Sequence, residues 1–224
     1  MQKIEKVFTD CSMVFLEKTF GIRQVSVLDE LSLWLNLADT IVLTETEQNV
    51  IPIFQYSLNK NVISWNEQDL SLHFVGPMVS LVDFTEPYRY NLFAERRISA
   101  ELLSVNNENY YLFGRPDEMI ASGFREPEAP YFFINEFKRE TDPNGSPLAQ
   151  VLAAMLVGQA INQNQHPIYG CYILGRDWYF LALKDSSFAI SKGYDATTEQ
   201  VFDLYRILKA LKEMVKQLTE TTNE

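Results

Sequence analysis

The feature that most constrains the fold is a predicted strand at residues 131–139 with an apolar start, followed after a short turn by a long apolar helix. The segment begins YFFI, and apolar residues on both faces are typical of a strand buried inside a sheet. The stretch TDPNGS predicts a turn. Ser146-Pro147 then places proline at the first position of a helix that ends near Asn162. Because strands follow in IYGCYILG and DWYFLALKD, the sequence predicts a β–helix–β crossover within one sheet.

Shorter patterns predict the elements around this crossover. Residues 90–105 and 109–122 are predicted to be the two strands of a hairpin with its turn at Asn106-Asn107-Glu108-Asn109, and Gly114 is a candidate bulge. The stretch FREPEAP reads as a loop, and FAISKGYD continues the sheet. Residues 197–218 are predicted to form a final amphipathic helix, with an apolar face of Val201, Leu204, Tyr205, Leu208, Leu211, Val215 and Leu218.

The first part of the chain, residues 1 to about 62, is predicted to be helical. Apolar residues recur at helical spacing in residues 27–39 and 45–58, and Pro52 predicts a kink or a late start in the second of these helices. A third helix is expected to begin at Ser64, because Ser64 and Glu67 have the spacing of a capping box. Gly76-Pro77 predicts a bend within it.

Together these elements predict an α/β fold with a mixed central sheet and helices on both faces. Residues 1–63 are expected to be a helical extension packed on a core of residues 64–218, with residues 219–224 as a tail. No apolar run reaches the ~18 residues of a membrane helix. Charged residues interrupt the apolar ones near the N-terminus, unlike a signal peptide, so we expect a cytoplasmic protein without a membrane partner.

The composition narrows the classes of function. Two cysteines and two histidines are too few for a disulfide framework or a Cys/His zinc site. The formal net charge of −11 counts against a general affinity for nucleic acid, although a local basic groove on an acidic protein stays compatible with it. A homo-oligomer or a protein partner is also left open.

Two acids and a lysine lie where neighbouring strands should meet. Asp117 belongs to the predicted strand before residues 131–139, and Glu136 and Lys138 share one face of the latter because side chains alternate along a strand. Antiparallel pairing would bring Asp117 within reach of Glu136. Two adjacent carboxylates resist joint ionisation unless a cation lies between them, and Mg²⁺ prefers such oxygen ligands. A neighbouring lysine could position the attacking water or stabilise charge on a phosphate.

This arrangement resembles the PD-(D/E)XK nuclease superfamily, which has the restriction-endonuclease-like fold and an αβββαβ core. Pro116-Asp117 and Glu136-Phe137-Lys138 match its motif, and the helix from Ser146 follows as the core requires. The resemblance covers about residues 64–218. The stretches WNE (65–67), PYF (130–132) and QVLAAM (150–155) are also similar to phrases in a bacterial subfamily of uncharacterised members.

The resemblance implies a role for each motif residue. Asp117 and Glu136 would bind Mg²⁺ or Mn²⁺, and Lys138 would be catalytic. Glu67 matches an additional metal-binding glutamate in the preceding helix, and Gln150 matches a supporting glutamine in the helix after the motif. The tyrosine that some members have four residues after this glutamine is absent, because residue 154 is alanine.

Each of these residues also has a plainer interpretation. Glu136 and Lys138 could form an exposed edge-strand ion pair, worth at most about 1 kcal/mol. Asp117 could initiate a turn, Glu67 could be only the capping-box acid, and Gln150 could lie on the helix surface. The basic residues of the last helix could face solvent or contact a DNA backbone; they are Arg206, Lys209, Lys212 and Lys216.

The sequence thus predicts a metal-dependent nuclease that hydrolyses phosphodiester bonds of DNA or RNA and binds nucleic acid weakly because of its charge. The alternative is a non-catalytic domain on the same fold that binds a protein or nucleic acid.

Overall fold

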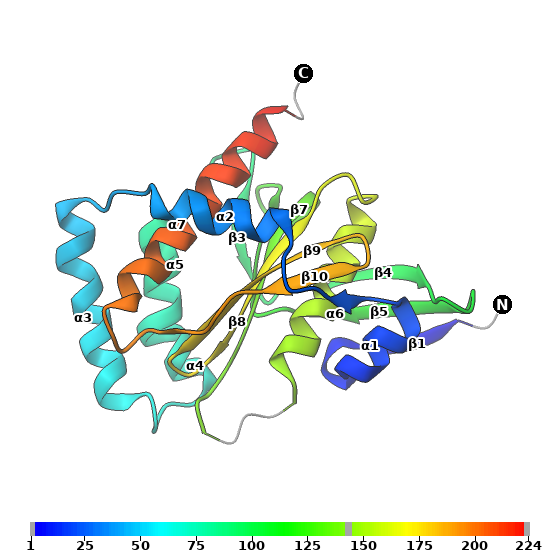
Figure 1. Ribbon diagram of the computed structural model, residues 1–224, viewed down its shortest axis with the longest axis horizontal. Helices are drawn as coiled ribbons and strands as arrows, with labels where there is room; N and C mark the ends of the chain where they lie inside the picture. The colour runs from blue at the N-terminus through cyan, green and yellow to red at the C-terminus, as the bar shows by residue number, and fades with distance from the viewer. Residues whose placement is uncertain (1–2, 142–144, 222–224) are drawn as a thin grey trace.

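A mixed sheet crosses the centre of the protein in the computed structural model, which describes residues 3–141 and 145–221 (Figure 1). Its strands follow the order β2–β10–β9–β8–β7–β6–β3, and β11 also pairs with β9. The strands are β2 (Arg23–Gln24), β3 (Asn91–Ala94), β6 (Glu118–Ser122), β7 (Glu128–Lys138), β8 (Ile168–Leu174), β9 (Asp177–Lys184), β10 (Ser187–Ile190) and β11 (Tyr194–Asp195). The predicted α/β class with a mixed sheet is therefore confirmed.

The predicted crossover is present. Strands β7 and β8 are parallel, with Phe133 opposite Tyr169, and α6 (Pro147–Ile161) connects them. The Ser146 hydroxyl caps α6 by accepting a hydrogen bond from the backbone N–H of Ala149 at 3.3 Å. Nearly every side chain of α6 is buried, because the helix lies between the central sheet and a second, smaller sheet.

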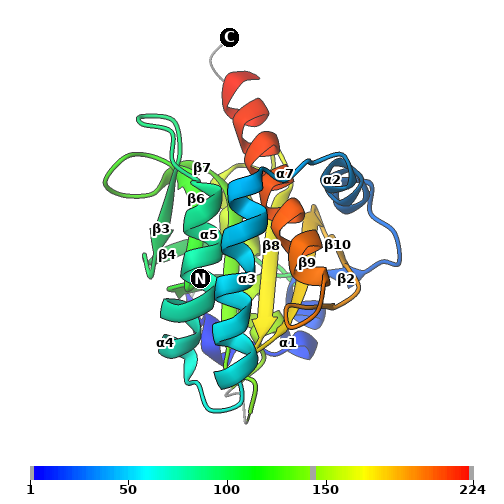
Figure 2. The ribbon, with the colours of Figure 1, turned by 90° about the vertical axis from the view of Figure 1, so that its left-hand side faces the viewer.

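The opposite face of the central sheet is covered by helices α2 (Asp29–Asp39), α3 (Glu45–Asn61), α5 (Gly76–Val82) and α7 (Gln200–Thr221) (Figure 2). Trp34 on α2 is fully buried there. Its ring contacts those of Phe133, Tyr169 and Phe180 edge-on at 5.3–6.3 Å between centroids, and its Nε1 donates to the carbonyl of Ile207 at 2.8 Å. The N-terminal segment is thereby in contact with both the sheet and the last helix.

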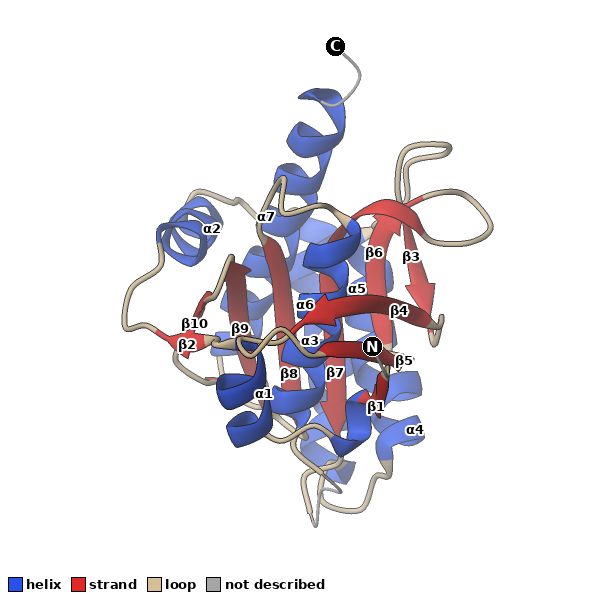
Figure 3. Ribbon diagram, turned by 90° about the vertical axis from the view of Figure 1, so that its right-hand side faces the viewer, coloured by secondary structure: helices blue, strands red, loops and turns tan. Residues whose placement is uncertain are grey.

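The small sheet corrects the predicted hairpin. Each long strand predicted for residues 90–122 is broken in two, giving β3, β4 (Ile98–Leu103), β5 (Asn109–Gly114) and β6. Only β4 and β5 form the hairpin, and they join β1 (Ile4–Val7) in a separate sheet of order β1–β5–β4 (Figure 3). Gly114 is no bulge; it pairs with Ile98, and a Cβ at this position would lie 2.2 Å from the Phe8 ring.

The N-terminal segment is not purely helical, contrary to the prediction. It contains α1 (Met13–Phe20), α2 and α3, but β1 pairs with β5 and β2 pairs with β10. Helix α3 also continues through Pro52 without a late start. Pro52 is exposed, whereas Ile51 and Leu58 are fully buried, so packing of the apolar face outweighs the lost backbone donor.

The third helix begins two residues later than predicted. Its cap is Asn66, and Asn66 and Asp69 form the capping box of α4 (Glu67–Leu70). A π-helical turn (Ser71–Val75) then joins α4 to α5 where a bend was predicted at Gly76-Pro77. Strand β7 also starts within the predicted loop, at Glu128.

Two predictions fall partly outside the described residues. The turn after β7 includes residues 142–144, and the predicted tail includes residues 222–224, which lie outside them. The first residues of that tail belong to α7, which ends at Thr221. No helix within the described parts of the chain is long and apolar enough to cross a membrane.

Candidate active site

Asp117 and Glu136 come together where β6 begins and β7 ends. Glu118 pairs with Asn135 across the two antiparallel strands, so the next position along this register sets Asp117 opposite Glu136. Oδ2 of Asp117 accepts a hydrogen bond from the backbone N–H of Phe137 at 2.7 Å. That bond holds the Asp117 carboxylate against β7, beside Glu136.

Lys138 completes this group from the same face of β7. Its Nζ donates to Oε1 of Glu136 at 2.8 Å and lies 3.6 Å from Oε2 of Glu67. Glu136 and Lys138 are 5% and 8% exposed, so the pair is not the solvated edge-strand pair of the plainer interpretation. A buried pair of this kind carries a desolvation cost and is weak evidence of a purely stabilising role.

The Glu67 side chain does not cap α4, because the carboxylate of Asp69 accepts the hydrogen bond from the backbone N–H of Asn66. It stands at the first position of α4, with a side chain 40% exposed. Its carboxylate extends toward Lys138. The plainer interpretation of Glu67 as the capping acid is therefore wrong.

A pocket of about 470 Å³ opens beside these residues. Asp117 and Glu67 line it, together with Glu95, which the sequence reasoning missed. Glu95 follows β3, and its backbone N–H donates to the carbonyl of Asp117 at 3.0 Å. No sequence signal identified it, because residues 90–105 read as one unbroken strand. The remaining lining residues are Gln68, Ser71, Leu72 and Phe137.

Burial raises the pKa values of both acids. The pKa of Asp117 rises to about 6 through burial, opposed by the hydrogen bond from Phe137 and the charge of Lys138. The pKa of Glu136 rises to about 7 through burial and the nearby Asp117, opposed by Lys138. Burial lowers the pKa of Lys138, but Glu136, Asp117 and Glu67 outweigh it, so that pKa lies above its ordinary value. The site therefore holds excess negative charge.

These shifts predict a pH-dependent stability. A carboxyl whose pKa is raised in the folded state binds its proton more tightly there than in the unfolded chain. For Glu136, whose pKa rises from 4.5 to about 7, this contribution is fully present below about pH 4.5 and is lost as pH rises through about 7. Without metal, the loss of unfolding free energy between pH 5 and 8 should be smaller in Glu136→Gln than in wild type. Urea unfolding at both pH values measures the unfolding free energy of each protein. Equal losses in wild type and Glu136→Gln would contradict the raised pKa of Glu136.

A second acid, Glu118, was also missed although it follows Asp117 directly. It lies on the other side of β6 because side chains alternate, and Nδ2 of Asn135 donates to its Oε2 at 3.0 Å. Burial raises the pKa of Glu118 to about 7. The sheet thus carries a buried acid–amide pair directly behind the candidate site.

The remaining candidate site residue is Gln150. Gln150 is buried in the first turns of α6 rather than on its surface, and a Cβ at Gly145 would lie 2.9 Å from its Nε2. Within the described residues, no hydrogen bond joins Gln150 to Asp117, Glu136 or Lys138.

The basic residues of α7 are largely used within the protein. Lys209 pairs with Glu47 at 2.8 Å, Lys212 donates to the carbonyl of Val82, and Arg206 pairs with Asp203. Structural roles of this kind weaken the interpretation of the stripe as a DNA contact.

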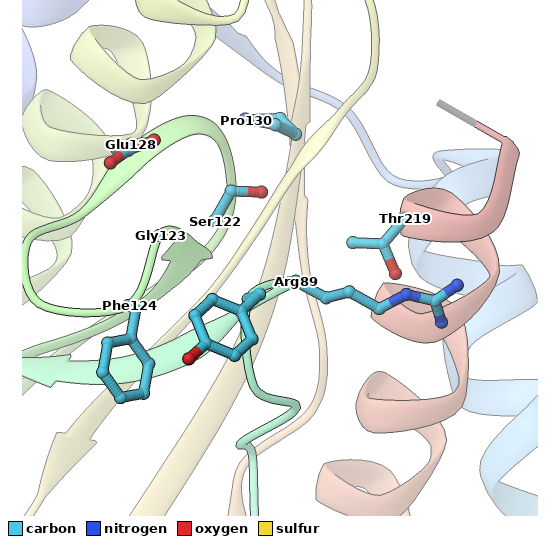
Figure 4. Close-up of a pocket in the computed structure, with 8 residues that line it drawn as sticks. Arg89, Ser122, Gly123, Phe124, Glu128, Pro130 and Thr219 are labelled. Carbon is cyan, nitrogen blue, oxygen red and sulfur yellow. The ribbon is translucent and has the colours of Figure 1, made fainter. Parts of the chain in front are cut away.

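A different pocket, of about 350 Å³, lies at the other end of β6 (Figure 4). Arg89 lines it, extends toward Thr219 of α7 and is paired with Glu86 at 3.1 Å. The rings of Tyr88 and Phe124 stack at its edge, 5.2 Å apart. Its remaining lining residues are Ser122, Gly123, Glu128, Pro130 and Thr219. Among the described residues of this lining Glu128 is the only acid, so the Asp117 end is the better candidate for a metal site.

The donor set at that end fits a hard divalent cation. Within the described residues, no group of three or more His, Cys, Asp or Glu side chains is arranged to hold a metal ion. Asp117 and Glu136 are two buried carboxylates with raised pKa values, which a bound cation would relieve. One or two carboxylates, completed by water and phosphate oxygens, is the usual protein contribution to Mg²⁺ sites.

No family model matches the sequence, and no curated protein is significantly similar to it.

Proposed function

We propose that this protein is a divalent-metal-dependent nuclease whose active site is formed by Asp117, Glu136 and Lys138. The observation that carries the proposal is the register of β6 and β7, which sets Asp117 opposite Glu136 with the Lys138 ammonium in contact with Glu136. Asp117 lines the pocket together with Glu67 and Glu95, and the buried Glu136 and Lys138 lie beside Asp117, so these side chains would supply both metal ligands and an electrostatic donor.

The order of elements supports the same proposal. Helix α5, strands β3, β6 and β7, helix α6 and strand β8 follow one another as αβββαβ, with the β4–β5 hairpin inserted between β3 and β6. The three strands are antiparallel neighbours, and β8 is parallel to β7. This order agrees with the core of the PD-(D/E)XK nucleases, the superfamily that the motif resembles.

Each residue of the proposed active site would have a distinct role in the reaction. Asp117 and Glu136 would hold Mg²⁺ or Mn²⁺, and the partly exposed Glu67 of the pocket lining would be a further ligand. When bound, the ion would polarise a phosphate oxygen and lower the pKa of a water. Lys138 would release Glu136 and donate hydrogen bonds to the attacking water or to the phosphate, where negative charge grows during the reaction.

Metal binding should be measurable without any substrate. Mn²⁺ or Mg²⁺ at millimolar concentration should raise the melting temperature of wild type, because the ion binds the folded site and not the unfolded chain. Asp117→Ala should lose this shift. Asp195→Ala serves as the matched control, since Asp195 lies on β11, away from the pocket. An unchanged melting temperature with metal in all three proteins would count against a metal site.

Cleavage tests the function itself. Purified protein with Mn²⁺ or Mg²⁺ should cut at least one member of a panel of single- and double-stranded DNA and RNA at low salt, where an acidic protein binds a polyanion best. EDTA should stop the reaction. If metal binds but no substrate is cut, the non-catalytic alternative replaces the nuclease.

A further inference from the structure

The small sheet β1–β5–β4 has two different faces. Its inner face packs on α6 and on the 3-10 helical turn Phe8–Asp10, and Leu112 and Ile98 are buried there. The pairing partners show which residues share the other face, because directly paired side chains point the same way. Tyr111 and Phe113 of β5 lie on this outer face with Ser99 of β4. Both rings are half-buried rather than covered.

Cations lie over these rings. The Arg97 guanidinium lies 4.9 Å from the ring centroid of Phe113, and Lys3 Nζ lies 3.7 Å from that of Tyr111. The Tyr111 hydroxyl donates to Ser99 Oγ at 2.9 Å. The contacts with the rings fix the positions of flexible cationic side chains that would otherwise move freely in solvent.

Positive charge concentrates at the end of the outer face that leads to the active site. At the far end, Lys3 is neutralised by Glu101 at 3.1 Å. At the near end, Ile98 pairs with Gly114, so the same register continues to Arg97 and Arg115. Both arginines are exposed, and neither pairs with a carboxylate among the residues that the structure describes. This is unusual on a chain with a formal net charge of −11.

The near end is also close to the catalytic group. Arg115 precedes Asp117 by two residues, so their Cα atoms are at most about 7.6 Å apart. The backbone bend after β3, which contains Arg97, is joined to Asp117 by the hydrogen bond from Glu95. Aromatic rings, cations and the candidate metal ligands therefore follow one another along β5 and into β6.

We propose that the outer face of the β1–β5–β4 sheet binds a single strand of nucleic acid and leads it to the Asp117 site. This inference rests on the proposed nuclease function and names its substrate as an unpaired strand. Phosphates would pair with Arg97 and Arg115. Unpaired bases would stack against the exposed side of the Arg97 guanidinium and against Tyr111 once Lys3 moves aside, as bases do on aromatic and guanidinium surfaces.

The test is a binding measurement in EDTA, where no cleavage can occur. The probe is a fluorescein-labelled 20-nucleotide strand, as DNA and as RNA, used single and annealed to its complement, and fluorescence anisotropy gives the dissociation constant from 25 to 200 mM NaCl. Arg97→Ala/Arg115→Ala should weaken binding at least tenfold. Its plot of log affinity against log salt should be shallower by about 1.4, since each phosphate contact on a single strand contributes ~0.7.

The control is Arg206→Ala/Lys216→Ala on α7, which changes the net charge equally and also tests the basic stripe of the last helix. It should stay within about twofold of wild type. Phe113→Leu should weaken binding about fivefold or more, because it removes the ring that holds the Arg97 guanidinium in place, whereas Tyr88→Leu, which removes a remote exposed ring, should not. Circular dichroism melting confirms that each variant is folded.

Three outcomes overturn the inference. They are equal losses in the two double variants, no binding of any strand by wild type, and binding of a duplex as tightly as the single strand. All are read without metal, so they are separate from a failed nuclease. If the protein binds the single strand as expected but cuts no substrate, the inferred binding surface stands and the nuclease proposal is wrong.

Discussion

Lys138→Ala is expected to lower the rate of metal-dependent cleavage by about 10²–10³-fold, the usual loss when one preorganised electrostatic donor is removed. Binding of Mn²⁺ should persist, because the carboxylates of Asp117 and Glu136 remain. Glu136→Ala should lose both cleavage and metal binding. Single-turnover cleavage gives the rate, and the metal-induced shift in melting temperature reports binding separately.

Lys216→Ala is the matched control for Lys138, because Lys216 is exposed on α7 and far from the pocket. It should cut at the wild-type rate. Equal trace activity in wild type and Lys138→Ala would identify a contaminating nuclease. The Glu136–Lys138 pair would then be a structural feature of the sheet.

Trp34→Ala is expected to lower the free energy of unfolding by about 3–5 kcal/mol, as for other large aromatic side chains removed from a core. The ring fills the space between α2 and the sheet, and its loss would also remove the hydrogen bond from Trp34 Nε1 to the Ile207 carbonyl. Urea unfolding followed by circular dichroism measures the change.

Leu33→Ala, one residue away on the same helix, is the control. Leu33 is 66% exposed, so its removal should change the unfolding free energy by no more than about 0.5 kcal/mol. Similar values for the two variants would mean that α2 does not pack on the sheet in solution.

Long periodic segments made the central crossover predictable. The helix from Pro147 has a proline start, a serine cap and a largely apolar sequence, and tertiary packing agrees with each of these local signals. The alternation in β7 likewise placed Glu136 and Lys138 on one face, next to each other in space. The candidate site could be proposed from the sequence because all three motif residues lie on, or next to, such elements.

The predictions failed where local signals were ambiguous or lacking. Ser64 and Asn66 are both good caps with an acid three residues later, so the sequence could not choose between them. The chain leaves β3 for a second sheet at Glu95-Arg96-Arg97, which contains neither glycine nor proline. Strands β1 and β2 are too short to show alternation, and pairing with distant residues defines them.

The placement of β2 and Trp34 has a consequence for how the chain can be made. Strand β2 pairs with β10, and Trp34 bonds to Ile207, which is 173 residues further along the sequence. During synthesis the first three helices therefore emerge long before their partners and must wait, with apolar faces uncovered, until most of the chain has left the ribosome. Such distant pairings also slow folding, because a long loop must close before its contacts form. Chaperones would find their binding surface in this segment, and an interruption of synthesis before α7 would release a chain that cannot bury Trp34.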